Sequence, residues 1–310
     1  MLQVLTITAP IFILIGLGYL SATLGVLSRE QLRGVGSFVI TFAMPAMVIK
    51  ALSERRMGEV FNLHYLLAYG LASLACFAAG LLLFKLYRKA DLQNSAIAGL
   101  GMAVSNSAFI GYPVAAMVAG SHAVVVLALG MLVENLLMLP LALALAEAGR
   151  QQGGSVFNVL AQTLKRLARN PLIVAIVIGG SLSLLEVKIP AAPLKVIEML
   201  AQASAPAALF VIGGVLYGTK VRGQLNEIAQ ISAGKLLLHP LLVGLGFWLF
   251  GDIERDMVLA GLVMASAPMM SVYPILGQRF GVEGRCAAAL VITTLASFFT
   301  ISALLVVTQP

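Results

Sequence analysis

The sequence predicts an all-α polytopic membrane protein, and three observations carry that prediction. Hydrophobic residues make up 60% of the 310 residues and charged residues only 11%, whereas a soluble domain carries about 25% charged residues. Apolar segments long enough to cross a bilayer follow one another along the whole chain. No polar stretch between them is long enough to fold as a separate soluble domain.

We expect ten spans, arranged as two groups of five. The expected spans are 4–26, 34–52, 63–87, 95–119, 122–146, 171–187, 193–217, 229–250, 256–278 and 285–307. An odd number of spans in each half inserts the halves in opposite orientations, which is the inverted-repeat pattern. We therefore expect a first repeat at 1–148, a cytoplasmic linker at 149–170 with a short basic amphipathic helix, and a second repeat at 171–310.

Two of these spans carry similar polar interruptions, one in each half. The fourth span contains Ser, Asn, Ser, Gly and a Tyr-Pro pair at 105–113, and the ninth span has a matching outline that ends in Tyr-Pro at 266–274. The same sequence separation joins three proline pairs, which are Pro113 and Pro274, Pro10 and Pro171, and Pro45 and Pro206. Paired Gly/Pro-interrupted segments in two halves indicate the binding site of a transporter.

The prolines predict where the two helices break. Pro113 lacks a backbone donor and clashes with the carbonyl of Phe109, so we expect a free acceptor at membrane depth. Such a break is tolerated inside protein or beside a wet cavity. Pro274 is expected to do the same in the second half, with Tyr112 and Tyr273 packing beside the crossing point. A simple proline kink is the alternative.

The residues around the breaks favour a small organic anion as ligand. Asn106 offers an amide with two donors, and the positive end of a broken helix favours a carboxylate. Hydroxyl donors accompany it on both interrupted spans, and these are Ser105, Ser107, Ser266 and Ser271. We predict that these five side chains bind the substrate, mostly through hydrogen bonds.

Ionisable side chains inside spans are costly and are functional candidates by default. Span 5 contains Glu134 and Asn135, and span 8 contains Lys235 and His239 at the spacing of one helix face. Glu134 is a candidate proton carrier or a structural partner of the broken helices. Lys235 is a candidate for balancing an anionic substrate, for pairing with Glu134 or for snorkelling to an interface. His239 is a candidate either for transferring protons or for a polar packing role.

Charge is distributed along the chain as in a membrane protein and not as in a nucleic-acid binder. The net charge is +7, but the Lys and Arg residues lie at span ends, where they orient the protein and meet anionic lipid. Their bias favours periplasmic termini in a bacterial inner membrane. Neither the two cysteines nor the three histidines have the spacing of metal ligands, so we expect no metal and no cofactor.

The motifs resemble one known family. Asn106 followed by Pro113, the segments around Pro45 and Pro206, the Lys235-Leu-Leu-Leu-His-Pro run and the Tyr273-Pro274 break are similar to those of the auxin efflux carrier family. That family includes plant PIN-type auxin carriers and bacterial transporters assigned to malonate and other small carboxylates. The resemblance covers essentially the whole chain.

The resemblance implies the fold of bile acid/sodium symporters, with broken helices 4 and 9 crossing at the site. Spans 1, 2, 6 and 7 would form a scaffold, often dimeric, and spans 3–5 and 8–10 a transport domain that moves like an elevator. Asn106 matches the residue that binds the substrate carboxylate in the plant carriers, and Glu134 matches a polar span-5 residue near it. Val48 replaces a plant serine, which disfavours a substrate resembling indole acetate.

These observations predict a secondary transporter of a small carboxylate or dicarboxylate, with alternatives inside and outside transport. A sodium-coupled organic anion symporter is the alternative within transport, although no acidic cation cage is evident; proton coupling and uniport both stay open. A channel or membrane sensor is the alternative of another class. An enzyme is not expected, because no nucleophile with a base and no cluster of metal ligands accompanies the spans.

Overall fold

The computed structural model describes residues 2–54, 62–149, 165, 168–217 and 225–308. Helices form almost all of this part of the chain, and the described residues contain no strand longer than one isolated bridge. The expected amphipathic helix of the linker falls mostly on residues outside the described ranges. The described residues contain six helical segments long and apolar enough to cross a membrane, with shorter apolar helices among them.

The first half begins with long helices that the prediction placed well. Its segments, in order, are α1 (Leu2–Thr23), α2 (Arg29–Phe38), the π-helical turn η1 (Val39–Ala43), α3 (Met44–Ser53), α5 (Leu63–Leu82), η2 (Leu83–Tyr87), α6 (Leu92–Ala103), η3 (Ser107–Gly111), α7 (Tyr112–Ala119), α8 (His122–Leu132), η4 (Val133–Met138) and α9 (Leu139–Ala148). Side-chain caps set several starts. Ser28 forms a capping box with Gln31, and Asp91 accepts from the Asn94 amide.

The second half follows the same order of long and interrupted segments. Its segments are α11 (Pro171–Leu184), α12 (Ala191–Leu216), α13 (Leu225–Ala233), η5 (Gly234–Leu238), α14 (His239–Phe250), α15 (Arg255–Ser266), α16 (Tyr273–Arg279) and α17 (Glu283–Thr308). Asn170 caps α11 by accepting from the Leu172 amide, and Pro171 occupies its first turn, where no intrahelical donor is needed.

Four prolines are accommodated by π-helical turns. Each is the second residue of the α-helix that follows η1, η3, η4 or η5, and these prolines are Pro45, Pro113, Pro140 and Pro240. A π-turn inserts one extra residue before the proline and so relieves the clash of its ring with the preceding turn. The expectation that Pro113 breaks the fourth span was therefore wrong, because the helix continues through it and the interruption lies earlier, at 104–106.

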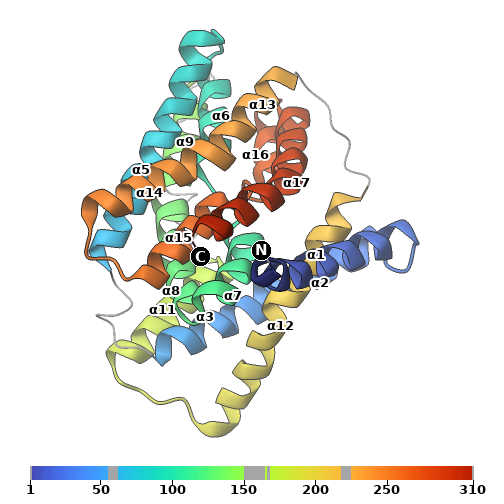
Figure 1. The fold of residues 1–310 in the computed structure, drawn as a ribbon, viewed down its shortest axis with the longest axis vertical. Helices are drawn as coiled ribbons and strands as arrows, with labels where there is room; N and C mark the ends of the chain where they lie inside the picture. The colour runs from blue at the N-terminus through green and yellow to red at the C-terminus, as the bar shows by residue number, and fades with distance from the viewer. Residues whose placement is uncertain (1, 55–61, 150–164, 166–167, 218–224, 309–310) are drawn as a thin grey trace.

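The helices fall into two packed groups. In one group α12 lies along α1 and α3, and α11 lies along α3; in Figure 1, α3, α11 and α12 occupy the lower part of the ribbon and α1 extends to the right. In the other, α5 packs between α6 and α14, α6 also contacts α9, and α17 contacts α13 and α16. Helices α7, α8 and α15 pack on one another, and α8 also contacts α3. The core passes through α8, which is buried over 123–131.

Close contact between α1 and α12 depends on glycine. A Cβ atom on Gly18 would overlap the carbonyl oxygen of Phe210, and one on Gly213 would overlap the carbonyl oxygen of Ile15. Small residues let two helix backbones approach in this way, which gains dispersion contacts that a lipid tail would not match. The first and seventh expected spans are therefore joined by backbone-to-backbone packing.

Substituting Gly18 with alanine tests that packing. The added methyl group would meet main-chain atoms, which cannot rotate away, so the two helices must separate at a cost of about 1–3 kcal/mol. We expect a lower thermal unfolding midpoint for purified Gly18→Ala. Gly16→Ala is the matched control, since that position of the same helix has open space around it. Equal midpoints for the two variants would contradict the close approach.

Candidate functional site

The two interrupted helices cross at their breaks and satisfy each other's backbone. Helix α6 ends at Ala103 and the helix resumes at Ser107, while α15 ends at Ser266 and resumes at Tyr273. The main-chain amide of Asn106 donates to the Pro268 carbonyl at 2.6 Å. Ser105 forms an isolated antiparallel β-bridge with Met269. Unravelled backbone is stable in an apolar interior only when its polar groups find partners, and here each break supplies the partners of the other.

Asn106 connects the two breaks through its side chain as well. Its Oδ1 accepts from the Phe109 amide at 3.4 Å, at the start of η3, and its Nδ2 donates to Ser271 Oγ at 2.8 Å. The residue is only 6% exposed. One Nδ2 hydrogen and the Ser271 hydroxyl hydrogen therefore remain as donors for a ligand at the crossing.

The side-chain carboxylate of Glu134 lies at the start of the helix that follows the first break. It reaches from η4, is 4% exposed, and its Oε1 accepts from Ser105 N at 3.2 Å and from Ser107 Oγ at 2.8 Å. The helix that runs from Ser107 to Ala119 has its positive end at this point, and that end stabilises the negative charge of the Glu134 carboxylate. The sequence assigned this helix end to a substrate carboxylate, but in the structure the carboxylate bound there belongs to the protein.

Lys235 and His239 form a second buried cluster, next to the second break. Lys235 Nζ donates to the Ala265 carbonyl at 2.6 Å and lies 2.9 Å from His239 Nδ1. His239 Nε2 lies 3.0 Å from Ser73 Oγ on α5. All three residues are fully buried. Lys235 therefore neither snorkels to an interface nor bonds to Glu134, and the expected contact between Lys235 and His239 on one helix face is present.

The remaining predicted residues are distributed around these clusters. Asn135 donates to the Met131 carbonyl of its own helix at 2.9 Å and not to the crossing. Tyr273 is fully buried and donates to the Ile97 carbonyl at 3.0 Å, which joins α16 to α6. Ser266 is buried and is the last residue of α15, and Pro274 is the second residue of α16. The structure thus brings together Asn106, Ser105, Ser107, Ser271 and Glu134.

A cavity of about 680 Å³ opens between α3, α12 and the turn between α7 and α8. Tyr112, the first residue after η3, lines it, so it reaches the interrupted helix just beyond the break. Lys50 also lines it and lies 3.3 Å from Glu198 and 4.0 Å from Glu54. The sequence analysis did not identify these two acids, because acids at span ends are common and follow no pattern.

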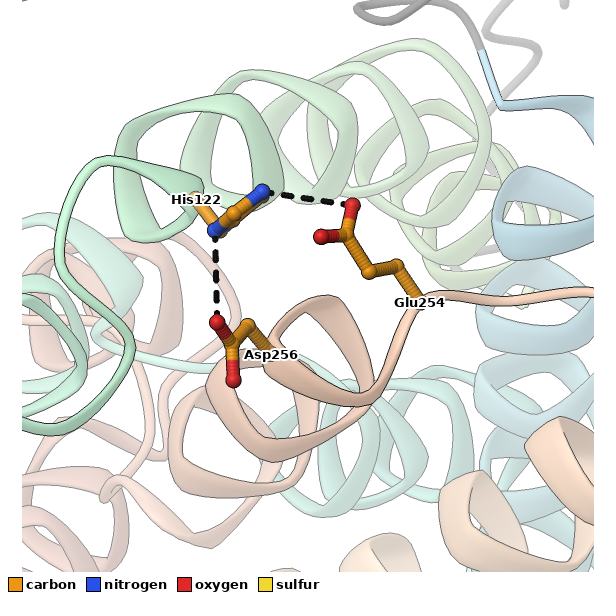
Figure 2. Close-up of side chains that lie close together, drawn as sticks. All are labelled: His122, Glu254 and Asp256. Atoms are coloured by element: carbon orange, nitrogen blue, oxygen red, sulfur yellow. Dashed lines mark ion pairs between the residues drawn. The ribbon is translucent and has the colours of Figure 1, made fainter.

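A polar cluster joins the start of α8 to the start of α15. Figure 2 shows His122 between two carboxylates, with Nε2 3.2 Å from Glu254 and Nδ1 3.7 Å from Asp256. One ligand atom from each residue lies within 4.8 Å of the other two. Both acids are exposed. The cluster joins the start of α8 to the start of α15, the helix that leads into the second break.

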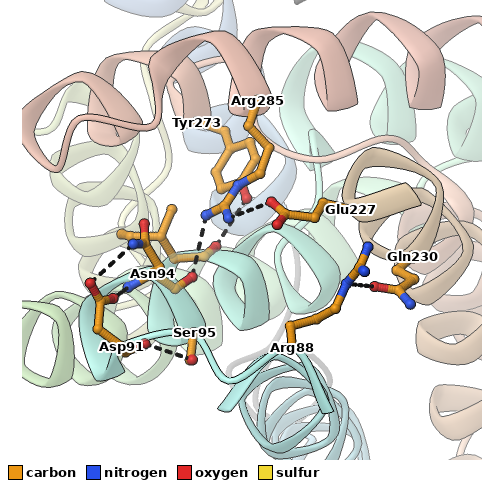
Figure 3. Close-up of polar contacts among 9 residues, drawn as sticks. Arg88, Asp91, Asn94, Ser95, Glu227, Gln230, Tyr273 and Arg285 are labelled. Atoms are coloured by element: carbon orange, nitrogen blue, oxygen red, sulfur yellow. Dashed lines mark hydrogen bonds and ion pairs between the residues drawn. The ribbon is translucent and has the colours of Figure 1, made fainter. Parts of the chain in front are cut away.

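A second polar network ties α6, α13 and α17 together. Arg285 donates to Glu227 at 3.0 Å and to the Asn94 carbonyl at 3.3 Å, and Arg88 donates to Gln230 at 3.0 Å (Figure 3). Arg285 is only 9% exposed and its guanidinium lies over the Phe84 ring. Arg285 therefore joins α17 to α6 and α13, and Arg88, which follows η2, joins that turn to α13.

Comparisons with known proteins agree with this architecture. The family described as membrane transport protein matches residues 3–305. A Rhizobium meliloti protein named "Putative malonate transporter" is 30% identical over 98% of this chain and 96% of its own length. The uncharacterized transporter YfdV of Escherichia coli is 26% identical over 93% of this chain and 92% of its own length.

A third relative extends the similarity to archaea. An uncharacterized transporter of Methanothermobacter thermautotrophicus is 24% identical over 86% of both chains. The names of the family and of these relatives indicate a transporter rather than an enzyme. The chain belongs to the membrane transport protein family, which is the auxin efflux carrier family that its motifs resemble, and it is a multi-pass membrane transporter.

Proposed function

We propose that this protein is a secondary transporter of a small carboxylate or dicarboxylate, bound where the two interrupted helices cross. The observation that carries the proposal is the hydrogen bond between Asn106 and Ser271, which leaves neutral donors of both breaks at one point. Neutral donors suit a carboxylate that must be released again, because a full ion pair would hold it too tightly for rapid turnover. Malonate is the first candidate, since a relative bears that name.

The cavity at Lys50 supports an anionic substrate. It lies between α3 and α12 on one side and Tyr112 on the other, so it offers a route from outside toward the crossing. Lys50 is the basic residue among those that line it, and its ammonium pairs with Glu198, which is itself 3.5 Å from Lys195. An entering carboxylate could take the place of Glu198 at Lys50 while Glu198 keeps Lys195.

We propose an elevator mechanism with ten spans in two inverted repeats, at 1–148 and 171–310, joined by a cytoplasmic linker. The scaffold would comprise α1, α2–α3, α11 and α12, whose mutual packing supports this division, and would form a homodimer. The remaining helices would carry the crossing through the membrane. The protein would lie in a bacterial inner membrane, in contact with anionic lipid, with both termini in the periplasm.

Glu134 is the proposed proton carrier. Its carboxylate accepts from the Ser105 amide and the Ser107 hydroxyl, so protonation would weaken its hold on the helix start beside Asn106. Substrate binding and protonation would then be linked through the same helix end. We prefer protons to sodium because, among the described residues, Glu134 is the one buried carboxylate at the crossing; a sodium-coupled symporter is the alternative.

Replacing Asn106 with alanine tests the substrate site. The variant loses the amide that bridges the breaks, so we expect malonate binding to weaken at least about tenfold. Binding is measured as the shift in thermal midpoint across a panel of mono- and dicarboxylates, with and without sodium. Asn135→Ala is the matched control, because its amide bonds only to its own helix. Unchanged affinity in the Asn106 variant would remove Asn106 from the site.

Replacing Glu134 with glutamine tests the coupling proton. If Glu134 must be protonated for transport, malonate uptake by wild-type proteoliposomes should rise as the external pH falls. The glutamine is always neutral but keeps an acceptor for Ser105 and Ser107, so uptake by Glu134→Gln should be much less dependent on pH. The measurement is the initial rate of uptake against pH for both proteins. Identical pH profiles would rule out the role.

A further inference from the structure

Lys235 contacts the carbonyl end of the second interrupted helix, where a coupling cation could otherwise bind. Helix α15 stops at Ser266, and the last carbonyls of a helix have no partner within it. In transporters with broken helices, such unwound carbonyls and half-helix C-termini coordinate the coupling cation. Here the Ala265 carbonyl accepts from Lys235 Nζ at 2.6 Å. We propose that the Lys235 ammonium is a resident cation, which makes transport independent of sodium.

The contacts of Lys235 differ from those of an ordinary ion pair. Its side chain is fully buried, and its two partners are a carbonyl and an imidazole, neither of which carries negative charge. A protonated lysine can only donate, so His239 Nδ1 accepts from it and Nε2–H donates to Ser73. The stabilisation of the charge comes from the negative end of α15, where a cation is favoured.

The two buried charges of the crossing neutralise opposite helix ends. Glu134 accepts from groups at the start of the helix Ser107–Ala119, and Lys235 donates to the end of α15. Each half of the chain therefore contains one interrupted helix, and a charged side chain from a neighbouring helix contacts the end of it that carries the opposite partial charge. The crossing holds its own anion and its own cation, so the substrate does not have to arrive together with a metal ion.

The backbone around Lys235 also fits a fixed position. Gly234 precedes it in η5, and a Cβ atom there would overlap the side chain of Met102, near the end of α6. Cys76 Sγ contacts both the Met102 and the Gly234 carbonyls, at 3.4 Å and 3.9 Å. Helix α6 and η5 are thus in close contact, so Lys235 is held against both interrupted helices and not on a mobile surface.

Removal and chemical replacement of the ammonium test the proposal, which rests on the proposed function for its transport readout. Lys235→Ala removes the atoms of a propylammonium ion and leaves space beside the Ala265 carbonyl. In proteoliposomes containing choline, malonate uptake by Lys235→Ala should fall about tenfold or more. Propylammonium or sodium should restore much of it, while wild-type uptake stays the same in choline, sodium and potassium. Lys188→Ala, at an exposed position, is the matched control.

Lys235→Met separates charge from volume, because methionine fills most of the space without a charge. It should lose uptake in every salt, and it decides the question if Lys235→Ala does not fold. Wild-type uptake that requires sodium, normal uptake by Lys235→Met in choline, or a Lys235→Ala defect that no cation repairs would each overturn the proposal.

A second readout distinguishes failure of this inference from failure of the proposed function. The thermal midpoint of purified Lys235→Ala should rise with propylammonium or sodium, but not with equal choline, and wild type should respond to none of them selectively. This measurement needs no substrate. Absence of malonate uptake by the wild-type protein would contradict the proposed function alone. If no cation changes the thermal midpoint of Lys235→Ala, the proposal that Lys235 is a resident cation is wrong.

Discussion

The structure depends on one constraint, which is that two helices stop inside an apolar protein and every backbone group they release must find a partner. Water cannot supply those partners in the middle of a membrane. The Asn106 amide therefore bonds to the Pro268 carbonyl, and Ser105 pairs with Met269. This requirement places the two interruptions in contact, so the polar groups of both halves converge at one point.

Electrostatics at the crossing follow from the same interruptions. A broken helix exposes a positive start and a negative end, and each would be costly to leave unmatched in a low dielectric. Glu134 and Lys235 are buried at one start and one end, respectively. What remains for a ligand is a set of neutral donors centred on Asn106 and Ser271. The proposed carboxylate substrate would bind these donors and leave again without breaking a buried ion pair.

The positions of the prolines show where reasoning from sequence succeeded and where it failed. The all-helical character of the described residues follows from their long apolar segments, and both polar stretches singled out in the sequence contain a break between helices. The break itself was misplaced in the first half, because a proline does not reveal whether the preceding turn widens. A π-turn precedes the helix that contains Pro113, while no such turn precedes Pro274, which is the second residue of α16, the helix that begins after the break.

The sequence by itself determined that the chain is helical, that it belongs in a membrane and that Asn106, Glu134 and Lys235 are polar residues inside apolar spans. These conclusions rest on composition and on the spacing of residues that are close together in the sequence. Only the tertiary structure decided which of those groups meet. The sequence allowed an ion pair between Glu134 and Lys235, but the two side chains lie at different helix ends. His122, Lys50 and Arg285 each contact a residue that is distant in the chain. Contacts between distant segments depend on how helices pack, and no local pattern records that packing.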